Sequence, residues 1–149
     1  MRRRRALEVE RLSQQFEPLE HRRKVIVGMG SPMVFDVMDP VRPTSQIWEH
    51  WVRALTAASR ANSSLYVIDP SGITGDVKLS GSTGLVAQTG GEAFYNSNKF
   101  EQHVERIWSE AGHYFLLGHS PALSKRELHR IQVSVGRQGV RARARRSRG

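Results

Sequence analysis

Lys24-Val25-Ile26-Val27-Gly28-Met29 and Ser64-Leu65-Tyr66-Val67-Ile68 are the two stretches that decide the fold class. Each is a short, continuous apolar run that turn-forming residues follow, Gly30-Ser31-Pro32 in the first case and Asp69-Pro70-Ser71-Gly72 in the second. Continuous apolar runs of this length are typical of strands buried on both faces of a parallel sheet. The sequence therefore predicts two such strands, at residues 24–29 and 64–68.

Three segments around these strands have helical spacing of their apolar residues. Residues 6–17 form the first, which Pro18 ends. Thr44 or Ser45 can cap the second, which runs to about Asn62. The third has a capping-box pattern at Asn98 and Glu101, and Gly112 ends it. The apolar positions that define the three helices are Val9, Leu12, Phe16, Ile47, Trp51, Leu55, Ala58, Phe100, Val104, Ile107, Trp108 and Ala111.

Further strands are expected later in the chain. Residues 84–88 can make a helical turn or two before a third strand at 92–95, and residues 114–117 form another apolar run. Two alternating segments, 130–135 and 140–145, flank a Gly136–Gly139 turn and predict an antiparallel hairpin. The order of elements predicts an α/β fold, a partial doubly wound parallel sheet with helices on both faces and a C-terminal hairpin.

The predicted organisation follows these elements. Residues 1–19 are a basic, weakly helical N-terminal segment, and residues 20–121 are the α/β domain. Residues 122–146 are a hairpin extension, and residues 147–149 are a tail.

The net charge of the 149-residue chain is +9, with 23 Lys+Arg against 14 Asp+Glu. Such an excess of positive charge is typical of proteins that bind nucleic acids or membranes. Ten of the basic residues lie in residues 1–5 and 137–149, where there is no acidic residue. The rest of the chain holds the other thirteen basic residues and all 14 acidic residues. The body of the chain is therefore close to neutral. The ten terminal arginines are Arg2, Arg3, Arg4, Arg5, Arg137, Arg141, Arg143, Arg145, Arg146 and Arg148.

The composition argues against several classes of protein. The chain has no cysteine, which excludes disulfides, thiolate metal ligands and a cysteine nucleophile. No apolar run reaches the roughly 20 residues of a membrane-spanning helix. The basic start is followed by Glu8 and Glu10, where a signal peptide would have an apolar core. We therefore expect no membrane span and no export signal, and the sequence leaves the compartment open.

The segment Gly118-His119-Ser120-Pro121-Ala122 imitates the G-x-S-x-G nucleophile elbow of α/β-hydrolases. In that elbow the backbone N–H after the serine helps to form the oxyanion hole, and Pro121 has no N–H. Ala122 also replaces the glycine that allows the tight turn. A serine hydrolase that uses Ser120 is therefore the least favoured hypothesis, and we expect no enzyme activity.

Neither the histidines nor the glycines are spaced as in a metal or nucleotide site. No two histidines lie four residues apart on one helix, so we expect solvated surface side chains. The stretch Gly81-Ser82-Thr83-Gly84 lacks the lysine of a P-loop. We expect neither a metal nor a cofactor. The six histidines are His21, His50, His103, His113, His119 and His129.

Asp69 and Ser71 follow a predicted strand, at the edge where open α/β sheets place their ligands. One carboxylate is too little for a hard divalent cation, which prefers several oxygen ligands. The favoured interpretation is a turn in which Asp69 caps its own loop and Gly72 supplies a positive φ.

The candidate contacts for an anion or nucleic acid are Arg141, Arg143, Arg145 and Arg146. Arginine contacts with phosphates add affinity that is independent of sequence. No aromatic residue lies among them for base stacking, and a charged edge strand that discourages aggregation explains the alternation equally well. Nucleic-acid binding through the Arg-rich termini is therefore the alternative hypothesis.

Several segments in order resemble the C-terminal half of the VWFA-related family, the von Willebrand factor type A-like proteins of Acidobacterial type. The resemblance covers residues 20–146 approximately. The segments that carry it are Ala54-Leu55-Thr56-Ala57-Ala58-Ser59-Arg60-Ala61-Asn62, Leu65-Tyr66-Val67-Ile68-Asp69-Pro70-Ser71-Gly72, Thr89-Gly90-Gly91-Glu92-Ala93-Phe94-Tyr95-Asn96, His113-Tyr114-Phe115-Leu116-Leu117-Gly118-His119-Ser120-Pro121, His129-Arg130-Ile131-Gln132-Val133-Ser134-Val135 and Val140-Arg141-Ala142-Arg143-Ala144-Arg145.

The resemblance implies a doubly wound sheet with strand order 3-2-1-4-5-6 and a metal-ion-dependent adhesion site. The Asp-x-Ser-x-Ser loop of that site does not occur here, and Gly30-Ser31-Pro32 stands where its later aspartate should follow a strand. Metal-dependent adhesion is therefore not carried onto any residue. The resemblance also implies export, as for many members of the family, but the sequence of this chain contains no export signal.

The resemblance also implies that the first three strands and their helices are missing. The strand Lys24 to Met29 would then expose an apolar edge that pairs with a partner or with a second copy. The favoured hypothesis is a non-catalytic protein-binding or scaffold module, a partial von Willebrand A-like domain without a metal site.

Overall fold

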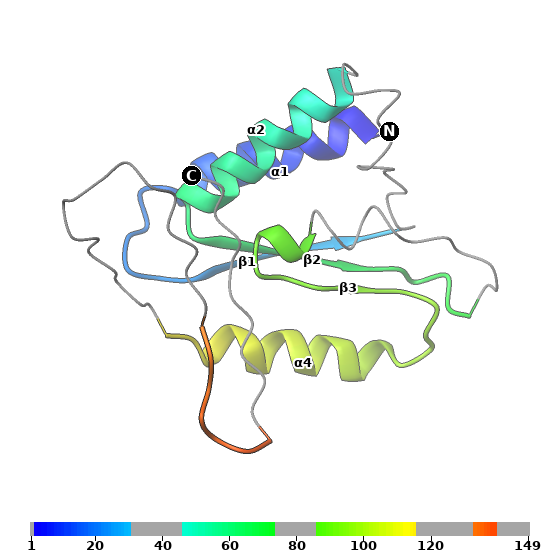
Figure 1. Ribbon diagram of the computed structural model, residues 1–149. Helices are drawn as coiled ribbons and strands as arrows, with labels where there is room; N and C mark the ends of the chain where they lie inside the picture. The colour runs from blue at the N-terminus through cyan, green and yellow to red at the C-terminus, as the bar shows by residue number, and fades with distance from the viewer. Residues whose placement is uncertain (1, 31–45, 74–85, 116–132, 140–149) are drawn as a thin grey trace.

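The computed structural model describes residues 2–30, 46–73, 86–115 and 133–139, and they form an α/β arrangement. The strands lie parallel in one sheet, in the order β1-β2-β3. Helices α1 and α2 cover one face of this sheet and α4 covers the other (Figure 1). The elements in chain order are α1 (Arg2–Phe16), β1 (Lys24–Met29), α2 (Gln46–Arg60), β2 (Ser63–Ile68), β3 (Ala93–Phe94) and α4 (Phe100–Gly112).

Most of the predicted elements within these residues are confirmed. Strands β1 and β2 and helices α2 and α4 lie within two residues of their predicted bounds, and residues 86–88 form a helical turn before β3. Helix α1 ends before Pro18 as predicted, but it begins at Arg2 and includes all four N-terminal arginines. Arginine is among the better helix formers, so a run of four extends the helix.

The capping box predicted at the start of α4 is wrong. Lys99 occupies the N-cap position and makes no side-chain cap hydrogen bond. The side-chain carbonyl of Asn98 instead accepts a hydrogen bond from the backbone N–H of Ile73, at 3.3 Å. A tertiary contact with the loop after β2 therefore takes the oxygen that a cap would use.

Burial on both faces is confirmed for β2 and wrong for β1. Every residue of β2 is buried, because β2 lies between two strands and between two layers of helices. In β1 only Ile26 is buried, while Val27 is 46% exposed and Met29 is 61% exposed. Within the described residues β1 is the terminal strand of the sheet, and this position leaves part of its apolar surface uncovered.

Neither the predicted strand at 114–117 nor the hairpin after it is seen in the described residues. Tyr114 and Phe115 belong to no strand, and Phe115 is almost fully exposed. Residues 133–135 are also not in a strand, although residues 136–139 turn as predicted, with Gly139 at φ +77°. The segments 116–132 and 140–149, which hold the rest of both predictions, lie outside the described residues.

The core has a part on each face of the sheet. On the α1 and α2 face, Ala6 and Val9 of α1 pack with Trp51 of α2 and with Ile26 and Leu65 of the sheet. The basic N-terminal helix is therefore part of the same core as the sheet. On the α4 face the buried residues are Tyr66, Ile68, Phe94 and Ile107.

Gly91 brings the chain close to β2. A Cβ at this position would lie within 1.8 Å of the Leu65 carbonyl oxygen, so only glycine fits here. This close approach sets the position of the next residue, whose backbone carbonyl, that of Glu92, accepts a hydrogen bond from the Val67 N–H just before β3.

Arg23, just before β1, joins the start of the sheet to the end of α4. Its guanidinium donates to the Ser64 hydroxyl at 3.2 Å, the Tyr66 hydroxyl at 3.2 Å and the Glu110 carbonyl at 3.0 Å. The Tyr66 hydroxyl in turn donates to the Glu110 carboxylate at 2.9 Å. Hydrogen bonds to a charged group are stronger than neutral ones, so this cluster fixes where α4 ends against the sheet.

Candidate functional site

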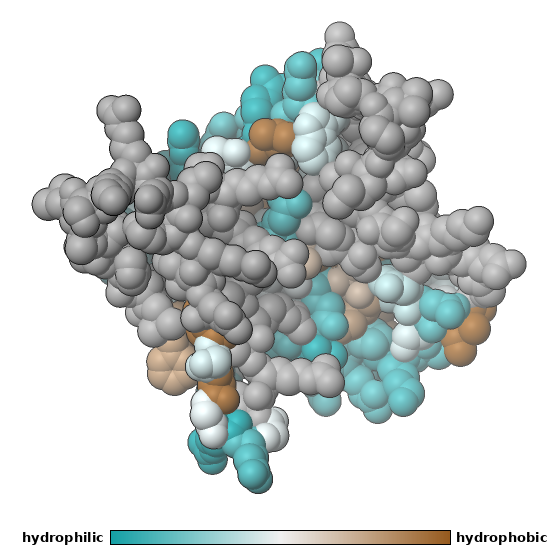
Figure 2. Space-filling model, in the orientation of Figure 1, coloured by the Kyte–Doolittle hydropathy of each residue, from teal (hydrophilic) through white to brown (hydrophobic). Residues whose placement is uncertain are grey.

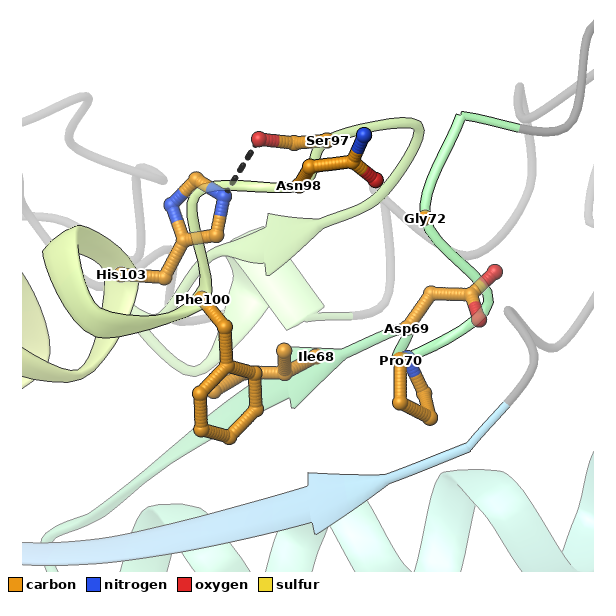
Figure 3. Close-up of a pocket in the computed structure, with 8 residues that line it drawn as sticks. All are labelled: Ile68, Asp69, Pro70, Gly72, Ser97, Asn98, Phe100 and His103. Carbon is orange, nitrogen blue, oxygen red and sulfur yellow. Dashed lines mark hydrogen bonds between the residues drawn. The ribbon is translucent and has the colours of Figure 1, made fainter.

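A pocket of about 320 Å³ lies where the carboxyl end of β2 meets the start of α4 (Figure 3). Parallel strands point their carboxyl ends to this edge, and open α/β sheets commonly place ligands there. Ile68 and Phe100 supply apolar surface, while the polar groups come from the loops on either side. The full lining is Ile68, Asp69, Pro70, Gly72, Ser97, Asn98, Phe100 and His103.

The interpretation of Asp69 as a turn residue is confirmed. The side chain is buried, and its carboxylate accepts a hydrogen bond from the Ser71 N–H at 3.0 Å. Gly72 has φ +72°, the positive value predicted for it. Figure 3 places the Asp69 carboxylate beside the Gly72 loop, away from His103.

Ser97 and His103 form a pair that sequence reasoning missed. The Ser97 Oγ and His103 Nε2 lie 3.0 Å apart in a hydrogen bond, and the Lys99 N–H also donates to that Oγ at 3.2 Å. The His103 ring stacks on Phe94, with 4.5 Å between the ring centroids. No motif signals this pair, because the two residues are six apart and span the junction of a loop and a helix.

A nucleophilic serine first requires a histidine within hydrogen-bond distance. The pair of Ser97 and His103 meets this requirement and no further one. A catalytic base needs a further group that orients its second nitrogen. Within the described residues no carboxylate bonds to His103. The stacking on Phe94 and the two bonds to Ser97 explain both side chains as parts of the loop structure.

The prediction that the histidines are solvated surface side chains is wrong for two of them. His50 is buried in α2, where its Nδ1 accepts a hydrogen bond from Arg53, and His103 is half-buried. His21 and His113 are exposed, as predicted. His119 and His129 lie outside the described residues, as do Ser120 and the arginines predicted for anion contact, Arg141, Arg143, Arg145 and Arg146.

The outer edge of β1 is a second candidate site. Lys24 N–H donates to the Asn62 carbonyl and Gly30 N–H to the Ile68 carbonyl, both at 3.0 Å, so the even-numbered residues of β1 bond to β2. In a parallel ladder the residues between them turn their N–H and C=O groups the opposite way. Val25, Val27 and Met29 therefore direct their backbone groups to an edge where no described strand pairs with them.

The side chains of the same three residues lie on the α4 face of the sheet. Val25 packs against the cluster that contains Tyr66 and Ile107, and alternation places Val27 and Met29 on the same face. On this face Val25 is partly buried, whereas Val27 and Met29 are exposed.

One flank of α4 continues this apolar surface. His103 and Arg106 lie over Phe94 of β3, so the opposite flank of the helix faces β1. Val104 and Trp108 lie on that flank, and Trp108 is 82% exposed. Figure 2 shows hydrophilic side chains over the part of α4 that faces the viewer. We call Val27, Met29, Val104 and Trp108 the apolar flank.

Two other kinds of site are not found in the part of the chain that the structure describes. No group of three His, Asp or Glu side chains gathers there as metal ligands. No helix there is long and apolar enough to cross a membrane.

Comparisons with protein-family models, with curated proteins and with solved structures find no match to this chain.

Proposed function

We propose that this chain is a non-catalytic protein-binding or scaffold module that receives an extended strand along the outer edge of β1. The observation that carries the proposal is the coincidence of two features on one strand. Val25, Val27 and Met29 direct their backbone N–H and C=O groups outward, and two of the three side chains are exposed although they are apolar.

Addition of a strand to a sheet edge is a common mode of peptide recognition. Backbone hydrogen bonds supply affinity, and surfaces that contact alternate side chains supply specificity. The apolar flank offers such a surface beside β1. At the opposite edge of the sheet, β3 has only two residues, and so short a strand can pair with little of an added strand. The edge of β1 is thus the better site for an added strand.

We further propose that the chain corresponds to the C-terminal half of a VWFA-related domain. The parallel order β1-β2-β3 agrees with the last three strands of the 3-2-1-4-5-6 order, and β1 then occupies the position that pairs with the central strand of that order. This assignment supports a docking role for β1, and the missing Asp-x-Ser-x-Ser loop keeps metal-dependent adhesion out of the proposal.

A peptide-display selection against the immobilised full chain tests the docking role. We expect enriched peptides with alternating apolar residues that bind the wild type and lose binding to the Val27→Pro variant. The Val27 N–H points away from β2, so proline there removes a docking donor without removing a bond of the β1–β2 ladder. The control is Val27→Thr, which keeps the N–H and the strand propensity. Peptides that bind the Val27→Pro variant as tightly as the wild type would falsify the proposal.

Nucleic-acid binding through the Arg-rich ends is the second candidate function. The observation in its favour is the helix α1, whose first residues, Arg2–Arg5, are all arginines, with Arg3 and Arg4 exposed. A duplex DNA titration distinguishes the two functions. Binding that weakens steeply with added salt and is lost on deletion of residues 137–149 would favour this candidate.

A further inference from the structure

We infer that one side of α4 is a second docking surface, and that it takes an amphipathic helix of a partner protein whose apolar stripe is bordered by lysines or arginines. The inference goes beyond the proposed strand docking, since it concerns side chains of α4 and uses no backbone group of β1. It depends on two rows of exposed side chains that adjoin along this helix.

The first row is apolar and consists of Phe100, Val104 and Trp108, which we call the α4 ridge. Residues four apart lie one above the other on a helix, so these side chains form a continuous line over two turns. They are 40%, 44% and 82% exposed, whereas Ile107 is buried against the sheet. Helix α4 therefore has more apolar surface than its packing on the sheet uses.

The second row is acidic and consists of Glu101 and Glu105, which are both exposed. Glu101 is three residues from Val104, and Glu105 is three residues from Trp108. This spacing makes each glutamate a neighbour of the α4 ridge on the helix surface. Like charges four residues apart also repel each other, and a basic group of a partner placed between them would relieve this repulsion.

The opposite flank of α4 differs, because its charges already have partners. Arg106 pairs with Glu92 at 2.8 Å and with Glu110 at 3.1 Å. Neither Glu101 nor Glu105 makes an ion pair among the described residues, although the chain has an excess of basic residues. The unpaired negative charge of α4 thus lies on the same side as its uncovered apolar surface.

The two rows together decide between kinds of partner. A membrane would accept the α4 ridge, but its anionic lipids would repel the glutamates. A second copy of α4 would bring another acidic row to the interface instead of a basic one. A basic amphipathic helix is complementary to both rows, because its apolar side chains pack on the α4 ridge while its lysines or arginines lie over the glutamates.

A pair of designed peptides tests the charge of the partner. The first, of about 18 residues, is made of leucine, lysine and alanine, with the lysines beside a stripe of leucines. The second has glutamate in place of each lysine. We expect the lysine peptide to bind the full chain at micromolar concentration and to gain helix, and the glutamate peptide to bind at least about tenfold more weakly. Fluorescence anisotropy measures the affinities and circular dichroism the helix content.

Two outcomes of this experiment overturn the inference. One is equal affinity of the two peptides. The other is no binding of the lysine peptide at about 100 µM of the chain.

Substitution of Trp108 tests the position of the bound helix. Trp108→Ala should weaken binding of the lysine peptide about tenfold or more, since tryptophans commonly carry much of the affinity of an interface. The side chain is mostly exposed, so the variant should still fold. The control is Leu7→Ala, which removes an exposed apolar side chain from α1 on the other face of the sheet. Unchanged affinity of the Trp108→Ala variant contradicts the inference.

The double variant Glu101→Gln, Glu105→Gln tests the acidic row. It should bind the lysine peptide about threefold more weakly at low salt, and the difference should nearly vanish at about 1 M salt, where charges are screened within about 3 Å. The control is Glu17→Gln with Glu49→Gln, which changes the net charge equally at exposed positions outside α4. Equal weakening by both double variants would indicate a general charge effect and refute the role of the acidic row.

Further measurements separate this surface from the β1 edge and from other occupants. The Val27→Pro variant should bind the lysine peptide as tightly as the wild type. Loss of binding in that variant would assign the peptide to the β1 edge, which refutes this inference and leaves the strand-docking proposal in place. A wild-type dimer that Trp108→Ala dissociates, or binding to phosphatidylcholine vesicles that Trp108→Ala abolishes, would show that a second copy or a membrane covers the α4 ridge instead.

Discussion

Single side chains decide two properties of this protein. One is how the start of the sheet is joined to the end of α4, and the other is whether the pocket can perform chemistry. Arg23 makes hydrogen bonds to β2, to α4 and to the Gly90 carbonyl before β3. Ser97 and His103 face each other at the pocket, yet each is also explained by local structure. The first case is a matter of stability and the second of function, so the two need different measurements.

We expect Arg23→Ala to lower the free energy of unfolding by about 2 to 3 kcal/mol, because it leaves polar partners in a half-buried site without their charged donor. Arg22→Ala is the matched control, since Arg22 is exposed and its change should stay within about 0.5 kcal/mol. Urea titration followed by circular dichroism measures both. Equal losses in the two variants would show that the Arg23 hydrogen bonds add nothing to stability.

We expect no covalent labelling of Ser97 by a fluorophosphonate probe. Activation of a serine requires an oriented base and an oxyanion site, and the hydrogen bond to His103 supplies neither by itself. Mass spectrometry of the treated chain checks this residue and Ser120 in the same experiment, with His103→Ala as the control. Labelling of Ser97 that disappears in that variant would make the pocket an active site.

At the scale of elements, α2 and α4 cover opposite faces of the sheet and carry their tryptophans differently. Trp51 of α2 is fully buried against Leu65 and Ala54. Trp108 of α4 is mostly exposed, although α4 also packs on the sheet through Ile107. The same residue type therefore belongs to the core in one helix and to the surface in the other.

We expect Trp51→Ala to lower the free energy of unfolding by about 3 to 5 kcal/mol, the usual effect of removing a buried aromatic side chain. Trp108→Ala should change it by about 0.5 kcal/mol or less, because that side chain is mostly exposed. Chemical denaturation of both variants tests the assignment. A large loss of stability for Trp108→Ala would mean that this side chain is part of the core.

Local patterns predict elements well here and predict their surroundings poorly. The apolar spacing of α2 and the continuous run of β2 identify both, because each pattern reflects contacts that the element makes along its whole length. The run at β1 looks the same in sequence, but its burial depends on whether a further strand lies beside it, which no local pattern records. The Ser97–His103 pair likewise depends on where a loop meets a helix.

At the scale of the whole molecule, positive charge is concentrated at the start of α1. The four arginines there lie near the carboxyl end of β1, where a Cβ on Gly30 would lie 2.8 Å from an Arg5 guanidinium nitrogen. The segment 17–24 at the other end of β1 is mixed, with Glu17 and Glu20 beside Arg22, Arg23 and Lys24. This distribution is compatible with the near-neutral body and explains why the net charge alone is a poor guide to partners.

The hydrogen bond between Arg23 and Glu110 also has a consequence for synthesis of the chain on the ribosome. The two residues are 87 positions apart, so at about 5 to 20 residues per second Glu110 is added roughly 4 to 17 s after Arg23. The N-terminal helices and the first two strands emerge in that interval, before the helix that covers the second face. A nascent chain thus exposes the apolar α4 face of its sheet for several seconds, during which a chaperone or a neighbouring nascent chain can reach it.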